Sequence, residues 1–215
     1  IIDLDNRSNQ PMISNDKRYS IVFNGEIYNY KEIRKELESI GVKFYTDGDT
    51  EVLLEAYANY GSDTLDFLRG QFAFVIYDSL EESLFLARDR VGIKPLYFSL
   101  NEKNIIFSSE IKAIENSGLV PFSPDLDSYV AYLRHLCVPS NKTGNQNISK
   151  VEPGQFLKIT KNGLVEETKY WDPFSIEINY DINENEAVNK VEELLIDSVE
   201  YRKVSDVEVG LFLSG

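Results

Sequence analysis

Two neighbouring apolar runs constrain the fold most strongly. Residues 72–77 and 84–87 carry apolar side chains at successive positions, not at every second one. Because the side chains of a strand alternate between its two faces, such runs are typical of strands whose sheet is covered on both sides. The short segment 79–82 between them predicts a tight connection. We therefore expect a hairpin that is buried on both faces.

The size and charge of the chain narrow its class. With 215 residues, of which 42% are hydrophobic, it can bury a sizeable core, and its length suits one full domain plus part of a second. The formal net charge of -14 opposes binding to a phosphate backbone, because the electrostatic attraction that supplies most nucleic-acid affinity is missing. We expect a globular protein without a nucleic-acid partner.

Cysteine and histidine are scarce in this sequence. Cys137 is the single cysteine, which excludes an intramolecular disulfide, and His135 is the single histidine, so no cluster of these residues has metal-ligand spacing. No apolar run approaches the ~20 residues that cross a bilayer. The sequence predicts no metal site, no membrane partner and, from the scarcity of cysteine, a cytoplasmic protein.

Periodicity and turn residues predict the remaining elements. Residues 18–23 are expected to form a strand that ends in a turn at Asn24-Gly25-Glu26. A hairpin is expected to close on Asn162-Gly163, a pair typical of a type I′ turn. The other expected elements are helices from about Asn29 to Gly41 and over 51–60, 64–69, 110–115 and 125–136, with strands over 42–45, 96–100 and 105–108.

The C-terminal part follows a different pattern. Asn183 and Glu186 form a capping-box pattern, and a helical apolar stripe continues to about Arg202. Residues 207–213 are typical of a buried strand at the start of a parallel α/β sheet. We expect a first domain over residues 1–172, a linker over 173–182 and the start of a second domain over 183–215.

Several runs, taken together in their order and spacing, resemble the asparagine synthetase family. A single run is weak, because an Asn-Gly pair usually marks only a turn, but the ordered set is specific. The resemblance covers essentially the whole chain. The runs are Ile1-Ile2-Asp3-Leu4, Asn24-Gly25-Glu26-Ile27-Tyr28-Asn29, Asp49-Thr50-Glu51-Val52, Gly70-Gln71-Phe72-Ala73-Phe74, Arg88 to Tyr97, Ser109-Glu110-Ile111-Lys112-Ala113, Pro153-Gly154, Tyr170-Trp171 and Leu213-Ser214-Gly215.

The resemblance implies an α+β fold and an activity. The first domain is expected to be an N-terminal-nucleophile hydrolase αββα sandwich, with two stacked antiparallel sheets between helices. The first helix and strand of an α/β ATP-pyrophosphatase domain are expected to follow. The complete protein is expected to hydrolyse glutamine and to use the ammonia, with ATP and Mg²⁺, to convert aspartate to asparagine. A homodimer is its expected assembly.

The resemblance also implies residues of a glutamine site. Asn24, through its side-chain amide, and Gly25, through its backbone N–H, resemble the family's oxyanion hole, whose donors must be fixed in place beforehand. Glu26 and Asp49 resemble the residues that bind the substrate's α-ammonium, and Ile1 and Ile2 would contribute backbone contacts. Without the resemblance, Asn24-Gly25 is better interpreted as a turn and Asp49 as a helix cap.

The resemblance also bears on the nucleophile and on the nucleotide site. The family uses an N-terminal cysteine, and Ile1 is expected to lie downstream of it, so this chain alone is expected to be inactive and to hold no cofactor. Cys137 is interpreted as a buried or inert thiol, because it carries no free amino group. Leu213, Ser214 and Gly215 resemble the start of the family's pyrophosphate loop, an ATP-binding segment. The Arg88 to Tyr97 run is expected to be mainly structural.

Two other functions remain open from the sequence. A paralogous amidotransferase could act on another carboxylate acceptor, because the acceptor site would lie in the second domain. A non-catalytic glutamine-binding module would be indicated by a residue other than cysteine at the mature N-terminus.

Overall fold

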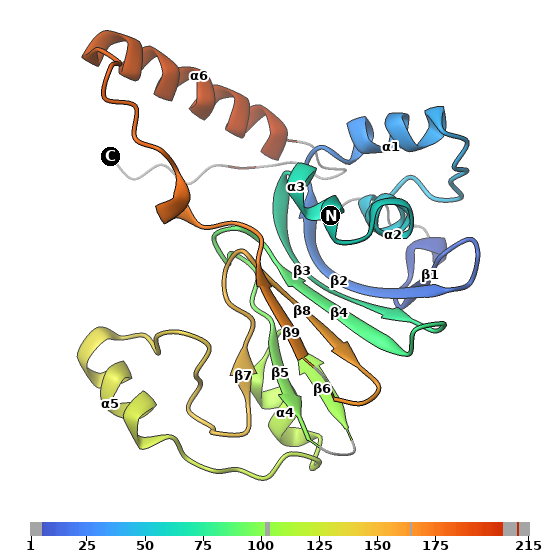
Figure 1. The fold of residues 1–215 in the computed structure, drawn as a ribbon, viewed down its shortest axis with the longest axis vertical. Coiled ribbons are helices and arrows are strands. Elements are labelled where there is room, and N and C mark those ends of the chain that lie inside the picture. The colour runs from blue at the N-terminus through green and yellow to red at the C-terminus, as the bar shows by residue number, and fades with distance from the viewer. Residues whose placement is uncertain (1–5, 102–103, 164, 204–209, 211–215) are drawn as a thin grey trace. The chain divides into compact units, whose positions relative to one another are not determined.

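A computed structural model describes residues 6–101, 104–163, 165–203 and 210 (Figure 1). The chain divides into two compact units. The sheet unit comprises residues 10–25 and 71–172, and the helical unit comprises residues 1–9, 26–70 and 173–215.

Two sheets dominate the structure. Every strand pairing with an established register is antiparallel, which confirms the predicted α+β class with two antiparallel sheets. The larger sheet has the order β1-β2-β3-β4-β8-β9, with β1 Met12–Ile13, β2 Tyr19–Ile27, β3 Gly70–Asp78, β4 Ser83–Arg88, β8 Gln155–Thr160 and β9 Val165–Lys169. The smaller has the order β6-β5-β7, with β5 Tyr97–Leu100, β6 Ile105–Ser108 and β7 Ser149–Lys150.

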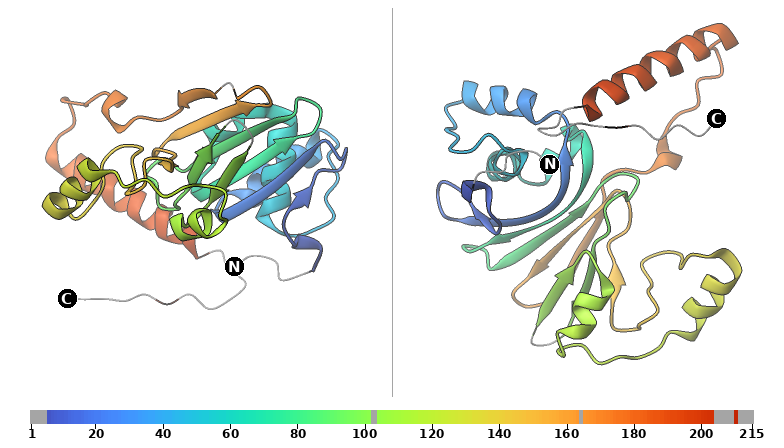
Figure 2. Two further views of the ribbon diagram at one scale, coloured as in Figure 1. Left: turned by 90° about the horizontal axis from the view of Figure 1, so that it is seen from below. Right: turned by 180° about the vertical axis from the view of Figure 1, so that it is seen from behind.

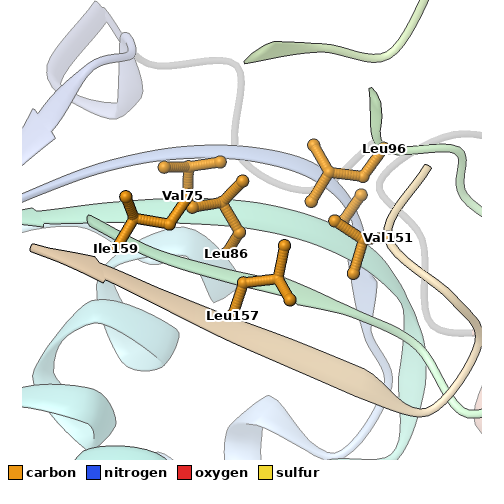
Figure 3. Close-up of a cluster of buried hydrophobic side chains, with 7 residues drawn as sticks. Val75, Leu86, Leu96, Val151, Leu157 and Ile159 are labelled. Carbon is orange, nitrogen blue, oxygen red and sulfur yellow. The ribbon is translucent and has the colours of Figure 1, made fainter. Parts of the chain in front are cut away.

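An aliphatic cluster forms the core between the two sheets. Figure 3 shows side chains of β3, β4 and β8 converging on Leu96 and Val151, which flank the smaller sheet at its β5 and β7 strands. Leu96 and Val151 are joined by a backbone hydrogen bond of 2.9 Å. Partly buried residues of β5 and β6, among them Phe98 and Phe107, pack against this cluster. The two sheets of this unit are therefore stacked face to face.

The predicted hairpin is confirmed as β3 and β4. Phe74 and Ile76 point to one face of β3, Ala73 and Val75 point to the other, and all four are at most 3% exposed. Phe85 of β4 lies on the same face as Phe74, with ring centroids 6.1 Å apart. The hairpin is buried on both faces, as the unbroken apolar runs predicted.

Two helices belong to the sheet unit. Helix α4, Ile111–Asn116, places the buried Ile114 in a small cluster with Tyr97 and Ile106 of the smaller sheet. Helix α5, Leu126–His135, extends away from that sheet with its flanking segments (Figures 1 and 2). The carboxylate of Asp125 caps α5 by accepting from the Ser128 backbone N–H and hydroxyl.

The helical unit contains the remaining helices. Helix α2 is apolar and buried through most of its length, with Val52, Leu53 and Leu54 fully buried. The capping box predicted for α6 is confirmed, because Asn183 and Glu186 bond reciprocally. Residues 207–213, predicted as a strand, lie outside the described residues except for 210. The bounds are α1 Tyr30–Ser39, α2 Asp49–Tyr60, α3 Thr64–Phe67 and α6 Glu184–Arg202, with single 3-10 turns at Asn6–Ser8, Gly61–Asp63 and Pro173–Ser175.

Two local predictions are wrong. Residues 42–45 form no strand: the backbone N–H groups of Tyr45 and Thr46 donate instead to the buried carboxylate of Glu51. The turn before β9 is not type I′, because Gly163 has a positive φ of 74° but Asn162 does not. The Gly163 N–H donates to the Thr160 carbonyl, so the connection contains residue 161 in addition to the predicted pair Asn162-Gly163.

Candidate active site

Asn24 and Gly25 do not form the turn that their sequence predicts. Strand β2 runs without interruption from Tyr19 to Ile27 and carries both residues inside it. The prediction failed because an Asn-Gly pair is favoured in turns by its own conformational freedom, whereas here the neighbouring strand determines the choice of residue.

Gly25 is required by close packing against β3. A Cβ atom at this position would lie 2.2 Å from the carbonyl oxygen of Gln71 and 2.7 Å from the Cα of Phe72. Both are backbone atoms, so no side-chain rotation could make room. The backbone of Gly25 therefore approaches β3 more closely than any other residue would allow.

Asn24 lines a pocket in the sheet unit. Its side chain is exposed, and its amide nitrogen donates to the hydroxyl oxygen of Ser109 at 3.0 Å. The pocket has a volume of about 280 Å³, close to the lower limit for small-molecule sites. Apart from Asn24 and Ser109, it is lined by Gln10, Val22, Phe23, Ala73, Phe74, Val75, Leu96, Phe107 and Ser108.

Asp49 is a buried carboxylate in the helical unit. It is the first residue of α2 and follows the cap position at Gly48, so the interpretation of Asp49 as the helix cap is wrong. Its side chain is 5% exposed and accepts from the Ile27 backbone N–H at 2.9 Å. Burial and, to a smaller extent, the negative charge of Glu26 together raise the pKa of Asp49 from its ordinary 3.8 to about 6, against the opposing effect of the Ile27 hydrogen bond.

The negative charge of Glu26 acts on the buried carboxylate of Asp49. Glu26 precedes Ile27 in β2, and its side chain is half-buried. When a buried carboxylate lies in the field of a second one, it costs free energy to keep both ionised, and a bound cation reduces that free-energy cost. This arrangement suits an ammonium group.

Arg88 and Asp89 are structural, as the sequence analysis predicted. The Arg88 guanidinium donates to three backbone carbonyls, those of Gly92, Lys94 and Val151, at 2.7–2.8 Å. Asp89 is 1% exposed. Its carboxylate accepts from the backbone N–H groups of Phe72, Val91, Ile93 and Lys94. The pair fixes the loop after β4 and holds the backbone of β3 at Phe72.

The other predicted residues contribute little to the described site. Cys137 follows α5 and is exposed, so of the two predicted alternatives, a buried or an inert thiol, the first is wrong and the second stays a prediction; Cys137 does not line the pocket at Asn24. His135 is exposed at the end of α5. The glutamine-site residues Ile1 and Ile2 and the ATP-site residues Leu213, Ser214 and Gly215 lie outside the described residues. Among those described, no group of three potential metal ligands occurs, and no helix is long and apolar enough to cross a membrane.

Ser109 and Gln10 were missed by the sequence analysis as site residues. Ser109 stands 85 positions after Asn24, and only the tertiary fold brings their side chains together. It belongs to one of the runs that carry the family resemblance, but the run alone gives it no role. Gln10 lies in a segment without a distinctive pattern.

A solved structure shares the fold of this chain. A structure of glutamine phosphoribosylpyrophosphate amidotransferase from Bacillus subtilis, complexed with ADP and GMP, is similar to this chain with a TM-score of 0.53 at 24% identity. The similarity covers 79% of this chain and 32% of that one. With the two stacked antiparallel sheets, it supports the predicted N-terminal-nucleophile hydrolase fold.

The family is shown by the sequence. Residues 1–171 match the family described as "Glutamine amidotransferase domain", and the chain belongs to this family. "Asparagine synthetase [glutamine-hydrolyzing] 1" of Bacillus subtilis is 38% identical over 218 residues, covering 100% of this chain and 33% of the relative. "Amidase chry2" of Gibberella zeae is 34% identical, covering 100% and 32%. The chain thus spans about a third of the length of these relatives.

Proposed function

We propose that the full-length protein containing this chain is a glutamine-dependent asparagine synthetase, and that this chain contributes part of its glutamine-hydrolysing site. The observation that carries the proposal is the Asn24-Gly25 step. It lies inside a strand, and its glycine is required by packing against Gln71 and Phe72. A step held so firmly suits donors that must be in place before charge develops.

Each residue then has a chemical role. When a thiolate attacks the side-chain amide carbon of glutamine, the carbonyl oxygen becomes negative, and the Asn24 amide and the Gly25 N–H would donate to it. Collapse of this intermediate releases ammonia and leaves an acyl-enzyme that water hydrolyses to glutamate. Glu26 and Asp49 would hold the α-ammonium of glutamine by charge-assisted hydrogen bonds. The attacking cysteine at the mature N-terminus of the parent protein remains a prediction.

The synthetase half of the reaction rests on the relatives. With Mg²⁺ bound, ATP would transfer its adenylyl group to the aspartate carboxylate with release of pyrophosphate, and ammonia would then displace AMP to give asparagine. Leu213, Ser214 and Gly215 are proposed to begin the nucleotide site. The domain limits, the homodimer and the cytoplasmic location likewise remain predictions.

A different acceptor is the second candidate. The match to an amidase of Gibberella zeae, at 34% identity over 100% of this chain and 32% of that relative, supports this candidate, because that relative carries another name. In that case the glutamine site keeps its role and only the molecule that receives ammonia changes.

The proposal is tested on the full-length protein with ATP and Mg²⁺. We expect glutamine and aspartate to give glutamate, asparagine and pyrophosphate in equal amounts. If glutamate forms but pyrophosphate is released only with a carboxylate other than aspartate, the second candidate is favoured. Absence of glutamate formation with every acceptor, in a folded preparation, would refute the assignment of a glutamine-hydrolysing site.

A further inference from the structure

The side chain of Asn24 is held by a residue to which the proposed function assigns no role. The Asn24 amide nitrogen donates to the Ser109 hydroxyl oxygen at 3.0 Å, and both residues line the same pocket. An amide nitrogen carries two hydrogens, so this bond leaves a second N–H of Asn24 for another acceptor.

The orientation of this amide matters for the proposed chemistry. Rotation by half a turn about the terminal side-chain bond exchanges the nitrogen and the carbonyl oxygen of an asparagine, and this torsion has no strong preference of its own. A carbonyl oxygen directed at a developing oxyanion would repel it. In the observed arrangement the Ser109 hydroxyl accepts from the Asn24 nitrogen, and this bond holds the amide in the donating orientation. Reversal of the amide would break this bond and would also require the Ser109 hydroxyl proton to turn toward the Asn24 oxygen.

Ser109 is itself placed by secondary structure. It follows the last residue of β6, Ser108, whose hydroxyl accepts from the Glu110 backbone N–H. Glu110 is the cap position of α4, and α4 is anchored by the fully buried Ile114. Ser109 therefore stands on a short connection fixed at both ends.

The backbone next to Asn24 is held as well. The Gln10 side chain donates to the Phe23 carbonyl at 3.0 Å and accepts from the Phe23 N–H at 2.6 Å. The β1–β2 ladder pairs Met12 with Ile21 and Ile13 with Ser20, so it does not include Phe23. Gln10 continues the ladder with its side chain, and the main chain entering Asn24 is fixed.

We infer that Ser109 is a positioning residue, which holds the Asn24 amide in the orientation that donates to the oxyanion during glutamine hydrolysis. The inference rests on the proposed role of Asn24. With the main chain fixed by Gln10, the side-chain torsions of Asn24 are the freedom that remains, and the bond to Ser109 restricts them. Loss of the Ser109 hydroxyl should therefore lower kcat more than it raises KM for glutamine.

A double-mutant cycle in the full-length protein tests this. Ser109→Ala is expected to lower kcat for glutamine hydrolysis by about tenfold, a part of the 10²- to 10³-fold that loss of a whole donor costs. Ser109→Thr, which keeps the hydroxyl, should restore most of it. Ammonia-dependent synthesis should stay unchanged. In an Asn24→Ala background, Ser109→Ala should have no further effect, because the side chain it orients is gone.

Ser117→Ala, at the other end of α4, is the matched control and should be near wild type. If Asn24→Ala itself leaves glutamine hydrolysis normal, the oxyanion assignment fails. If Asn24→Ala is slow but Ser109→Ala is not, or if the two losses multiply, the positioning role of Ser109 is refuted while the oxyanion assignment stands. A Ser109→Ala variant that loses both activities and melts early would show a structural role and would also refute the inference.

Discussion

Replacing Gly25 by alanine should damage glutamine hydrolysis through geometry alone. The new Cβ would lie 2.2 Å from the Gln71 carbonyl oxygen, so the strands must separate by about 1.2 Å to reach ordinary contact near 3.4 Å. Because the Gly25 N–H moves with its strand, the proposed donor shifts by about 1 Å, a misplacement that typically costs about 10²-fold in rate. Overpacking of this kind also destabilises a fold by about 1–3 kcal/mol.

The assay separates these two effects. Gly118→Ala is the control: its φ of 71° strains an alanine, but nothing lies within 4 Å of the added carbon. The strain should cost about 1–2 kcal/mol without changing the site. We expect both variants of the full-length protein to melt earlier, and only Gly25→Ala to lose about 10²-fold in glutamine hydrolysis. Equal activities in the two variants, or a Gly25→Ala rate within about threefold of wild type, would refute the reasoning.

Three further predictions concern two buried carboxylates, Asp49 and Asp89. Because the pKa of Asp49 is raised to about 6, its anionic form is lost as the pH falls through that value, and kcat/KM for glutamine should fall about tenfold per pH unit below it. In Asp49→Asn, kcat/KM should be low and independent of pH across this range. A wild-type kcat/KM that stays unchanged from pH 5 to 8 would contradict the assignment. The same raised pKa favours the folded state fully below pH 3.8 and loses this contribution as the pH rises through about 6, a dependence that Asp49→Asn should abolish in unfolding free energies. Asp89→Asn should destabilise the fold by about 3 kcal/mol, because the new amide NH₂ would face backbone N–H groups that the carboxylate now accepts from. Its Tm should fall by about 6–12 °C, whereas the Tm of the control Asp181→Asn, at an exposed position, should not change. Equal Tm values in the two variants would exclude the structural role of Asp89.

The central hairpin could be predicted from the sequence because its signal is local and strong. Residues 72–77 and 84–87 have unbroken apolar runs, and a strand buried on both faces explains such runs better than any other element does. Residues 42–45 were predicted as a strand on a much weaker pattern of four residues. Their backbone groups found a partner in Glu51, a carboxylate on the following helix that the pattern does not reveal.

The candidate site was predictable in part. The family resemblance pointed to Asn24, Gly25, Glu26 and Asp49, but it did not show that β2 continues through the first two of them. The physical reason for the glycine, contact with the backbone of β3, involves residues more than 40 positions away. The Asn24–Ser109 bond spans 85 positions, and no local rule of propensity or periodicity predicts such a contact.

The most direct test of the central claim is the Asn24→Ala variant of the full-length protein, measured for glutamate release and for ammonia-dependent pyrophosphate release on one preparation. If Asn24 donates to the oxyanion, glutamine hydrolysis should fall by about 10²- to 10³-fold. Ammonia-dependent synthesis should persist, because free ammonia enters after the step that Asn24 assists, and the thermal melt should match wild type. Normal glutamine hydrolysis, or an equal loss of both activities, would contradict the claim and return Asn24 to a purely structural residue of β2.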